Sequence, residues 1–238
     1  MILSIIIPVY NEEKFLESLL REVFDTQFTK EIIIVNDGSR DGTKSVLDKI
    51  ERDFKKNPPA LVNRLQVIHK EKNAGKGAAI ISGIREVTGD IVIIQDADLE
   101  LSPKEYGKLI EPFEKFNADV VFGSRFQMAG TRRVFPTTKY LANRLLTILS
   151  NMMSGIYLTD METCYKLFRR EVIQSFNLRS QRFGIEPELT AKAAKGNYKI
   201  YEVPITYNPR TIREGKKIGW RDGLEALAAI IKYNLLQG

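Results

Sequence analysis

An acidic motif follows directly on an apolar run, where IVIIQ gives way to DADLE (96–100). In an extended strand alternate side chains share a face, so Asp96 and Asp98 could reach one ion, and Glu100 could join them directly or through water. Hard carboxylate oxygens select Mg²⁺ or Mn²⁺, which also bind phosphate oxygens. The motif therefore predicts a divalent-metal site for a phosphate-bearing ligand. The alternative has Asp96 capping a turn and Asp98 paired with a basic side chain.

Three other side chains could act on a phosphate or a nucleoside. Asp37 suits a hydrogen bond to a base N–H or a ribose hydroxyl, although an Asx-turn would also explain it. Lys76 lies in NAGKGAA, which lacks the P-loop spacing but can still bring a lysine to a phosphate. Arg125 could clamp a diphosphate through paired N–H groups, or lie on the surface.

The scaffold for these residues alternates apolar runs with segments of helical periodicity. Continuous β-branched strands between helices predict a mostly parallel sheet covered on both faces. Ligands bind beyond the carboxyl ends of such strands, so the polar ends of successive strands should meet in one site. The expected strands are 3–10, 31–37, 65–69, 90–96 and 119–125, and the expected helices are 12–24, 42–54, 75–87 and 102–116.

The second half of the chain is less regular. Its long amphipathic helix and its terminal helix could lie on a membrane surface, with basic residues toward anionic headgroups, or could pack into the core. A membrane-protein partner could also supply anchoring. The expected elements are a helix at 137–157, a strand running into a helix at 164–172, a helix at 186–196, a strand-like segment at 198–210 and a final helix at 224–236.

Composition and charge limit the function classes. The 238 residues suffice for one large α/β domain, and the single cysteine, Cys164, excludes an intramolecular disulfide. Residues 1–123 carry 17 Lys and Arg against 21 Asp and Glu, whereas residues 124–238 carry 19 against 9. The basic half suggests an anionic partner, but it lacks the interleaved aromatics of a nucleic-acid module. We expect no signal peptide, no transmembrane span and a cytosolic setting.

Five motifs in order resemble family 2 glycosyltransferases of the GT-A fold, and more narrowly dolichol-phosphate mannose synthases and related polyprenyl-phosphate glycosyltransferases. The similarity continues more loosely to about residue 217. Two departures from the lipid-mannose synthases are Glu100, where they carry Gln, and TCYK (163–166), where they carry Ser-Gly-Phe-Arg. The motifs are SIIIPVYNE, IIIVNDGSRDGT, NAGKGAAIISGI, IVIIQDADLE and VVFGSR.

The resemblance implies a Rossmann-like, mostly parallel mixed sheet with helices on both faces. It divides the chain into a glycosyltransferase domain at 1–217, with a nucleotide-sugar half (1–125) and an acceptor half (126–217), and a C-terminal amphipathic helix (218–238). Asp96 and Asp98, with Glu100, would hold Mg²⁺ or Mn²⁺ on the donor diphosphate. The other implied donor-site residues are Pro8, Tyr10, Glu12, Asp37, Lys76 and Arg125.

The expected reaction is attack at an anomeric carbon with loss of a nucleoside diphosphate, from GDP-mannose or UDP-glucose. A polyprenyl (dolichyl) phosphate acceptor is already an oxyanion and needs positive side chains rather than a base. We expect those side chains to be Arg132, Arg133, Arg210, Lys216 and Lys217, in an enzyme peripheral to the cytoplasmic face of a membrane.

Two alternatives remain open from the sequence. A saccharide or other hydroxyl acceptor would need a general base, for which Glu186, Glu188 and Asp160 are candidates, and Asp160 is expected near the sugar. A non-catalytic nucleotide-sugar-binding protein on the same fold is the second, although intact Asp96, Asp98 and Arg125 argue against it. His69, the only histidine, is expected to be structural.

Overall fold

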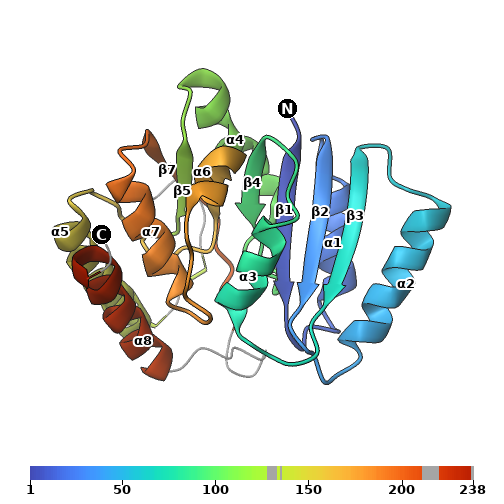
Figure 1. Ribbon diagram of the computed structural model, residues 1–238, viewed down its shortest axis with the longest axis horizontal. Coiled ribbons are helices and arrows are strands. Elements are labelled where there is room, and N and C mark those ends of the chain that lie inside the picture. Colours follow the sequence, from blue (N-terminus) through green and yellow to red (C-terminus); the bar gives the residue numbers. More distant parts are fainter. Residues whose placement is uncertain (128–132, 135, 211–219, 237–238) are drawn as a thin grey trace.

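The computed structural model describes residues 1–127, 133–134, 136–210 and 220–236, and the described chain folds around a seven-stranded sheet (Figure 1). The strand order is β3-β2-β1-β4-β6-β5-β7. The strands are β1 (Leu3–Val9), β2 (Lys30–Asn36), β3 (Val62–His69), β4 (Ile91–Ile94), β5 (Val120–Ser124), β6 (Lys166–Arg169) and β7 (Ile200–Pro204).

One strand runs against the others. β1 pairs in parallel with β2 and β4, β2 with β3, and β5 with β7. β6 is antiparallel to both of its neighbours, β4 and β5. The mostly parallel mixed sheet expected from the sequence is thereby confirmed. Because β6 is reversed, it starts at the edge where the other strands end, so the residues just before it join the same edge.

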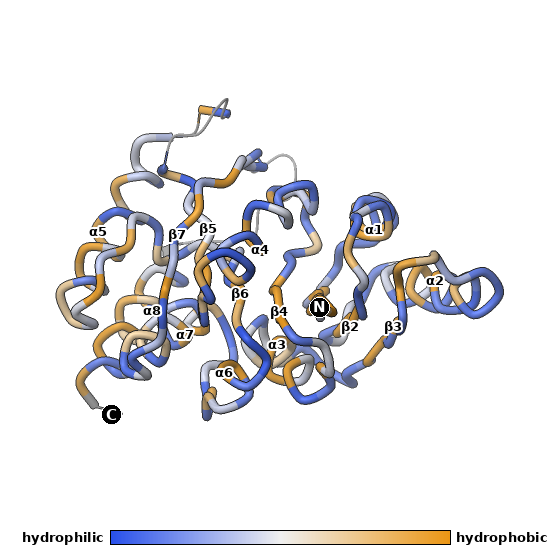
Figure 2. The backbone as a smooth tube through the Cα atoms, turned by 90° about the horizontal axis from the view of Figure 1, so that it is seen from above, coloured by the Kyte–Doolittle hydropathy of each residue, from blue (hydrophilic) through white to orange (hydrophobic). Residues whose placement is uncertain are grey.

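β1, β2 and β4 are buried along almost their whole length because helices cover both faces of the sheet. All residues of β2 and β4 are buried, as are all but Pro8 of β1. Figure 1 shows α3, α6 and α7 in front of the sheet and α1 and α4 behind it, and Figure 2 shows the hydrophobic strands between these two layers. A strand buried on both faces reads as a continuous apolar run rather than an alternating one.

The helices confirm most of the expected periodicity. α5 ends at a left-handed glycine, Gly155 (φ 75°), as helices commonly do. α8 packs against α5 and α7 at one side of the sheet, where Ala229 and Tyr233 bury against Ala191. The helices are α1 (Leu16–Phe24), α2 (Thr43–Lys56), α3 (Lys76–Ile84), α4 (Tyr106–Lys115), α5 (Thr137–Ser154), α6 (Arg170–Ser175), α7 (Ile185–Lys195) and α8 (Trp220–Ile231).

The expected strand over 90–96 is too long. β4 stops at Ile94, and the chain turns through Leu99, which adopts a left-handed conformation (φ 58°). Gln95 fixes this turn: its amide nitrogen donates to the carbonyls of Asp96 (2.9 Å) and Leu101 (3.2 Å). Asp96 and Asp98 therefore lie in a loop, and the alternation that would place them on one face of a strand does not apply to them.

Candidate active site

The carboxyl edge of the sheet gathers the polar side chains that the sequence singles out. Glu12 follows β1, Asp37 follows β2, and Asp96 and Asp98 follow β4. Arg125 follows β5, Arg210 follows β7, and the turn at 159–165 enters the reversed strand β6 at the same edge. Six segments that are distant in sequence thus meet where an α/β sheet binds its ligand.

Lys76, the first residue of α3, joins carboxylates from two parts of the chain. Its Nζ lies 2.9 Å from Asp96 Oδ1 and 2.8 Å from Glu186 Oε1, and donates to Cys164 Sγ at 3.4 Å. Burial alone would lower the pKa of this lysine, but Asp96 and its other neighbours raise the pKa well above the ordinary value. Lys76 is therefore a largely buried, charged link between the loop after β4 and the start of α7.

The glycines around Lys76 serve close packing. Gly75 has φ 100°, and a side chain on Gly77 would place its Cβ 2.1 Å from the carbonyl oxygen of Ser180. Asp37 holds this loop, because its carboxylate accepts from the N–H groups of Ala74 (3.0 Å) and Gly75 (2.7 Å) and pairs with Lys70 at 2.8 Å. Asp37 is buried, so its contacts give it a loop-positioning role. Its expected role in binding the base or ribose stays a prediction.

A single guanidinium, that of Arg210, joins two acidic segments. Nη2 lies 3.0 Å from Asp98 Oδ2, and Nη1 lies 3.2 Å from Glu12 Oε2. The guanidinium carbon also lies 5.2 Å from the ring centroid of Phe15. Arg210 therefore ties the end of β7 to the DADLE loop. This places it at the donor end of the site, beside the residues expected to hold the diphosphate.

The three carboxylates expected to form one metal-ligand set are not gathered in this structure. Asp96 faces Lys76, Asp98 faces Arg210, and Glu100 accepts from Tyr207 Oη (2.8 Å). Within the described ranges, no three His, Cys, Asp or Glu side chains cluster closely enough to hold a metal ion. Asp98 and Glu100 instead contact the Arg210 guanidinium, at 3.0 and 3.8 Å, whereas Asp96 pairs with Lys76.

Asp98 nevertheless lies in a strongly acidic setting. Burial, together with the nearby charges of Asp96 and Glu100, raises the pKa of Asp98 to about 6, although Arg210 opposes the shift. Carboxylates crowded in this way are stabilised by added positive charge. The donor chemistry of this loop therefore suits a divalent cation, even though the side chains are not prearranged around one.

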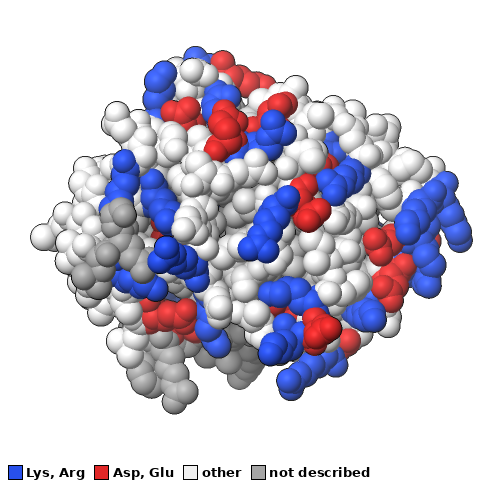
Figure 3. All heavy atoms as spheres, viewed as in Figure 1, with Lys and Arg blue, Asp and Glu red and all other residues white. Residues whose placement is uncertain are grey.

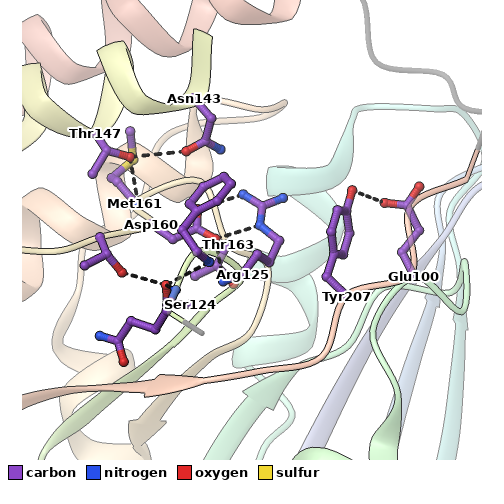
Figure 4. A network of polar contacts seen from close by, with 12 residues as sticks. Glu100, Ser124, Arg125, Asn143, Thr147, Asp160, Met161, Thr163 and Tyr207 are labelled. Atoms are coloured by element: carbon purple, nitrogen blue, oxygen red, sulfur yellow. Dashed lines mark hydrogen bonds and ion pairs between the residues drawn. The ribbon is translucent and has the colours of Figure 1, made fainter. Parts of the chain in front are cut away.

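Arg125 and Asp160 form a buried, two-pronged ion pair (Figure 4). The Asp160 carboxylate accepts from Nε (2.6 Å) and Nη2 (2.7 Å) of Arg125 and from its main-chain N–H (3.0 Å). The Arg125 guanidinium lies 5.2 Å from the ring centroid of Tyr207, and Tyr207 donates to Glu100. Figure 4 shows this line of contacts running from the DADLE loop toward α5. Asp160 therefore holds the Arg125 side chain in position. The expected contact between Arg125 and phosphate stays a prediction.

The remaining expected residues lie at several different places in the chain. Pro8 and Tyr10 are half-buried at the end of β1, and Arg133 donates to the carbonyl of Pro209 (3.0 Å), next to Arg210. Glu188, an alternative base, is buried and accepts from the N–H groups of Arg179 and Ser180. Arg132, Lys216 and Lys217 lie outside the described residues. His69 pairs with Asn36 and Asp48 on the side of the sheet, which fits a structural role.

Sequence reasoning misses two residues of this edge. Glu202, on β7, accepts from the N–H groups of Thr159 (2.9 Å) and Asp160 (3.1 Å) and so fixes the turn before β6. Burial, then the charge of Glu186, raises the pKa of Glu162 to about 7. Glu162 stands between Met161 and Thr163, and no local pattern there signals its role.

Figure 3 shows, on one face of the molecule, Lys and Arg side chains in several separate groups, some of them beside Asp and Glu, with uncharged residues over much of the surface between them. The described part of the chain contains no helix that is long and apolar enough to cross a membrane.

The sheet order and the charged carboxyl edge define an α/β glycosyltransferase of the GT-A fold. Residues 4–176 match the model of glycosyl transferase family 2, and the chain belongs to this family. The expected resemblance, the fold class and the expectation of a glycosyltransferase are confirmed.

Relatives with assigned activities cover most of the chain. A dolichyl-phosphate beta-glucosyltransferase of Trichomonas vaginalis is 33% identical over 87% of this chain, which spans 65% of that protein's length. A polyprenol monophosphomannose synthase of Mycolicibacterium smegmatis is 28% identical over 90% of this chain and 80% of its own. The glucosyl-3-phosphoglycerate synthase of Mycobacterium tuberculosis, solved with Mn²⁺, UDP and phosphoglyceric acid, superimposes with a TM-score of 0.71 at 19% identity, over 99% of this chain and 79% of its own.

Proposed function

We propose that this enzyme transfers a hexose, mannose or glucose, from a nucleotide sugar to a polyprenyl or dolichyl phosphate with inversion at the anomeric carbon. The two relatives named above act on this class of acceptor, one with glucose and one with mannose. A lipid-phosphate oxygen would form the bond to the anomeric carbon, and the bond from that carbon to the nucleoside diphosphate would break. The donor is GDP-mannose or UDP-glucose.

The observation that carries the acceptor assignment is that both carboxylate oxygens of Asp160 already accept hydrogen bonds within the protein. Asp160, expected near the sugar, has both carboxylate oxygens bonded to Arg125. Glu188 is bonded to main-chain N–H groups, and Glu186 is held through one oxygen by Lys76, whereas its other oxygen has no hydrogen-bond partner. A hydroxyl acceptor needs a free base because its pKa lies far above 7, whereas a phosphate acceptor is already ionised.

A divalent cation fits the donor edge. Glu12, Asp96, Asp98 and Glu100 supply hard oxygen atoms there, and Lys76 and Arg210 face them. Asp98, with Asp96, would hold Mg²⁺ or Mn²⁺. When bound, the cation would neutralise charge that develops on the departing nucleoside diphosphate.

The chain's own residues position the substrates. Gln95 fixes the loop that carries Asp96 and Asp98. Tyr106 and Tyr165 hold Gln95 in place, because both tyrosine hydroxyls donate to its side-chain amide oxygen, Oε1 (2.8 and 2.6 Å). Arg210 brings positive charge to that loop through its contact with Asp98. Such preorganised charge stabilises a developing anion without reorganisation during the reaction.

We place the enzyme at the cytoplasmic face of a membrane, bound peripherally through α5 and α8 or through a membrane-protein partner. Four apolar side chains of α5 form an exposed stripe at helical spacing, Leu141, Leu145, Ile148 and Met152, of which Leu145 is 69% and Met152 78% exposed. Leu224, Ile231 and Leu235 add exposed apolar surface at α8 and just beyond it. An apolar stripe of this kind suits a lipid surface.

A transfer assay tests the proposal. Purified protein with Mn²⁺ is incubated with labelled GDP-mannose, UDP-glucose and other sugar nucleotides, with and without a short polyprenyl phosphate. We expect labelled lipid only when the polyprenyl phosphate is present. Transfer to saccharides alone would replace the lipid acceptor by a hydroxyl acceptor, and donor binding without turnover would indicate a non-catalytic binding protein.

A further inference from the structure

The turn that enters β6 is held rigidly through its main chain. Glu202 accepts from the N–H groups of Thr159 and Asp160, and Met161 donates its N–H to Thr147 Oγ1 at 3.2 Å (Figure 4). Lys166 donates to the carbonyls of Met161 (2.7 Å) and Thr163 (2.5 Å) from below the turn. The positions of the side chains on this turn are therefore fixed before any ligand binds.

Three side-chain oxygens at this place have no hydrogen-bond partner although they are buried. They are Glu162 Oε1, Thr163 Oγ1 and Glu186 Oε2. Thr163 is completely buried, and Glu186 is 6% exposed. Leaving a buried polar atom unpaired is costly because it loses its hydrogen bonds to water, so native proteins contain few of them. Three together, on a braced turn, indicate that hydrogen-bonding groups from outside the chain belong there.

The unpaired oxygens lie beside the donor edge. Lys76 Nζ joins Glu186 to Asp96, at 2.8 and 2.9 Å, so the Glu186 carboxylate is one ammonium group away from the residues expected at the diphosphate. Glu162 lies close enough to Glu186 for the two charges to interact, and the Arg125–Asp160 pair borders it. In a nucleotide sugar the hexose is attached to the second phosphate, so its ring falls next to the diphosphate site.

We propose that Glu162, Thr163 and Glu186 bind the hydroxyl groups of the transferred hexose, an inference that rests on the proposed function. A sugar hydroxyl can donate to the two carboxylate oxygens, and the threonine hydroxyl can donate or accept. The same residues define the class of sugar. A neutral hexose satisfies them, whereas a uronic acid would bring a third carboxylate against Glu162 and Glu186.

The test compares each nucleotide sugar with its nucleoside diphosphate. Binding of UDP-glucose, UDP, GDP-mannose and GDP to the full chain is measured by titration calorimetry with Mn²⁺. For the pair that binds, we expect Glu162→Ala to lower the affinity for the nucleotide sugar about tenfold or more, and Thr163→Val to lower it about fivefold. The affinity for the nucleoside diphosphate should change less than twofold. Equal losses for both members of the pair, or no loss for either, would overturn the hydroxyl-binding role.

Deoxy analogues of the bound donor locate the contact. A donor that lacks the hydroxyl bound by Glu162 should bind the wild type more weakly, and this difference should disappear in Glu162→Ala, as in a double-mutant cycle. Glu171→Gln, on the exposed face of α6, serves as the matched control. A fall in turnover with unchanged donor affinity would instead make Glu162 a proton-transfer group and overturn the inference. Failure of the wild type to bind any nucleotide would overturn the proposed function itself.

Discussion

Arg210 Nη2 lies 3.0 Å from Asp98 Oδ2, although 112 residues separate the two along the chain. The contact joins the segment after β7 to the loop after β4, so residues expected to bind the acceptor and donor phosphates are in direct contact. Arg210 also neutralises part of the charge on Asp98. A cation or a phosphate that enters this place therefore meets an existing ion pair.

Asp98→Asn should lower metal-dependent transfer about 100-fold or more, because an amide oxygen carries no charge to hold Mg²⁺ or Mn²⁺. The fold should remain, since the substitution removes one of several crowded carboxylates. Transfer rates and Mn²⁺ binding by electron paramagnetic resonance measure the effect. Asp53→Asn, an exposed position on α2, is the control, and an unchanged rate in Asp98→Asn would remove the metal role.

Arg125→Ala should reduce the free energy of unfolding by about 3 kcal/mol, because it leaves the fully buried Asp160 without its partner. Asp160→Ala should cost a similar amount. The double variant Arg125→Met with Asp160→Leu should recover part of the loss, since it removes both charges together. Urea unfolding measures all three, and a double variant no better than the single ones would contradict this account.

Glu162→Gln should change how stability depends on pH. Folding raises the pKa of Glu162 from 4.5 to about 7, so its favourable contribution is complete below pH 4.5 and is lost as the pH rises through 7. The variant should therefore be more stable than the wild type at pH 8, by about 3 kcal/mol, with no difference attributable to ionisation at pH 4. Thermal unfolding in matched buffers measures this, and a pH-independent difference would count against it.

Lys216→Ala combined with Lys217→Ala should raise the KM for polyprenyl phosphate and leave the affinity for the nucleotide sugar unchanged. The reason is the loss of positive charge for an acceptor phosphate. This prediction comes from the sequence, since both lysines lie outside the described residues. Steady-state transfer at varied lipid concentration measures it, and full retention of lipid use would remove the phosphate clamp from this segment.

Leu145→Asp with Met152→Asp should weaken binding to anionic lipid vesicles at least tenfold, because it places two charges on the exposed apolar stripe of α5. Solution activity toward a short, soluble polyprenyl phosphate should change little. Vesicle co-sedimentation measures the effect, with Asn57→Asp and Ala60→Asp as a control pair on an exposed turn far along the sheet. Equal sedimentation of both pairs would leave α5 without a lipid-binding role.

The sequence predicts the order of strands and helices well, but it does not predict the directions of the side chains after β4. Runs such as IIIV and IVII predict buried parallel strands, because only a doubly covered sheet buries residues without alternation. The same reasoning extended β4 by two residues and so placed Asp96 and Asp98 on one face. Their directions depend on Gln95 and on Leu99, whose left-handed backbone has no clear sequence signal.

The site residues that were missed share a physical cause. Glu162 and Glu202 act through partners that lie 24 and 42 residues or more away, such as Glu186 and Asp160, and no local pattern announces such pairs. Asp160 was expected beside the sugar, and the contact that occupies it, with Arg125, appears only when β5 and β6 pair. Ion pairs between residues far apart in the chain form only when the protein folds, so the spacing of residues in the sequence does not reveal them.

The reversed direction of β6 has a consequence for how this enzyme could be altered. The chain leaves the sheet after β5 and returns to it at the start of β6, and both points lie at the same edge. The segment between them, which includes α5, therefore begins and ends beside the site residues. An exchange of α5 alone for that of a relative would leave Arg125, the turn that carries Glu162 and Thr163, and the donor loops in place. We expect such chimaeras to change what receives the sugar while keeping which sugar is given.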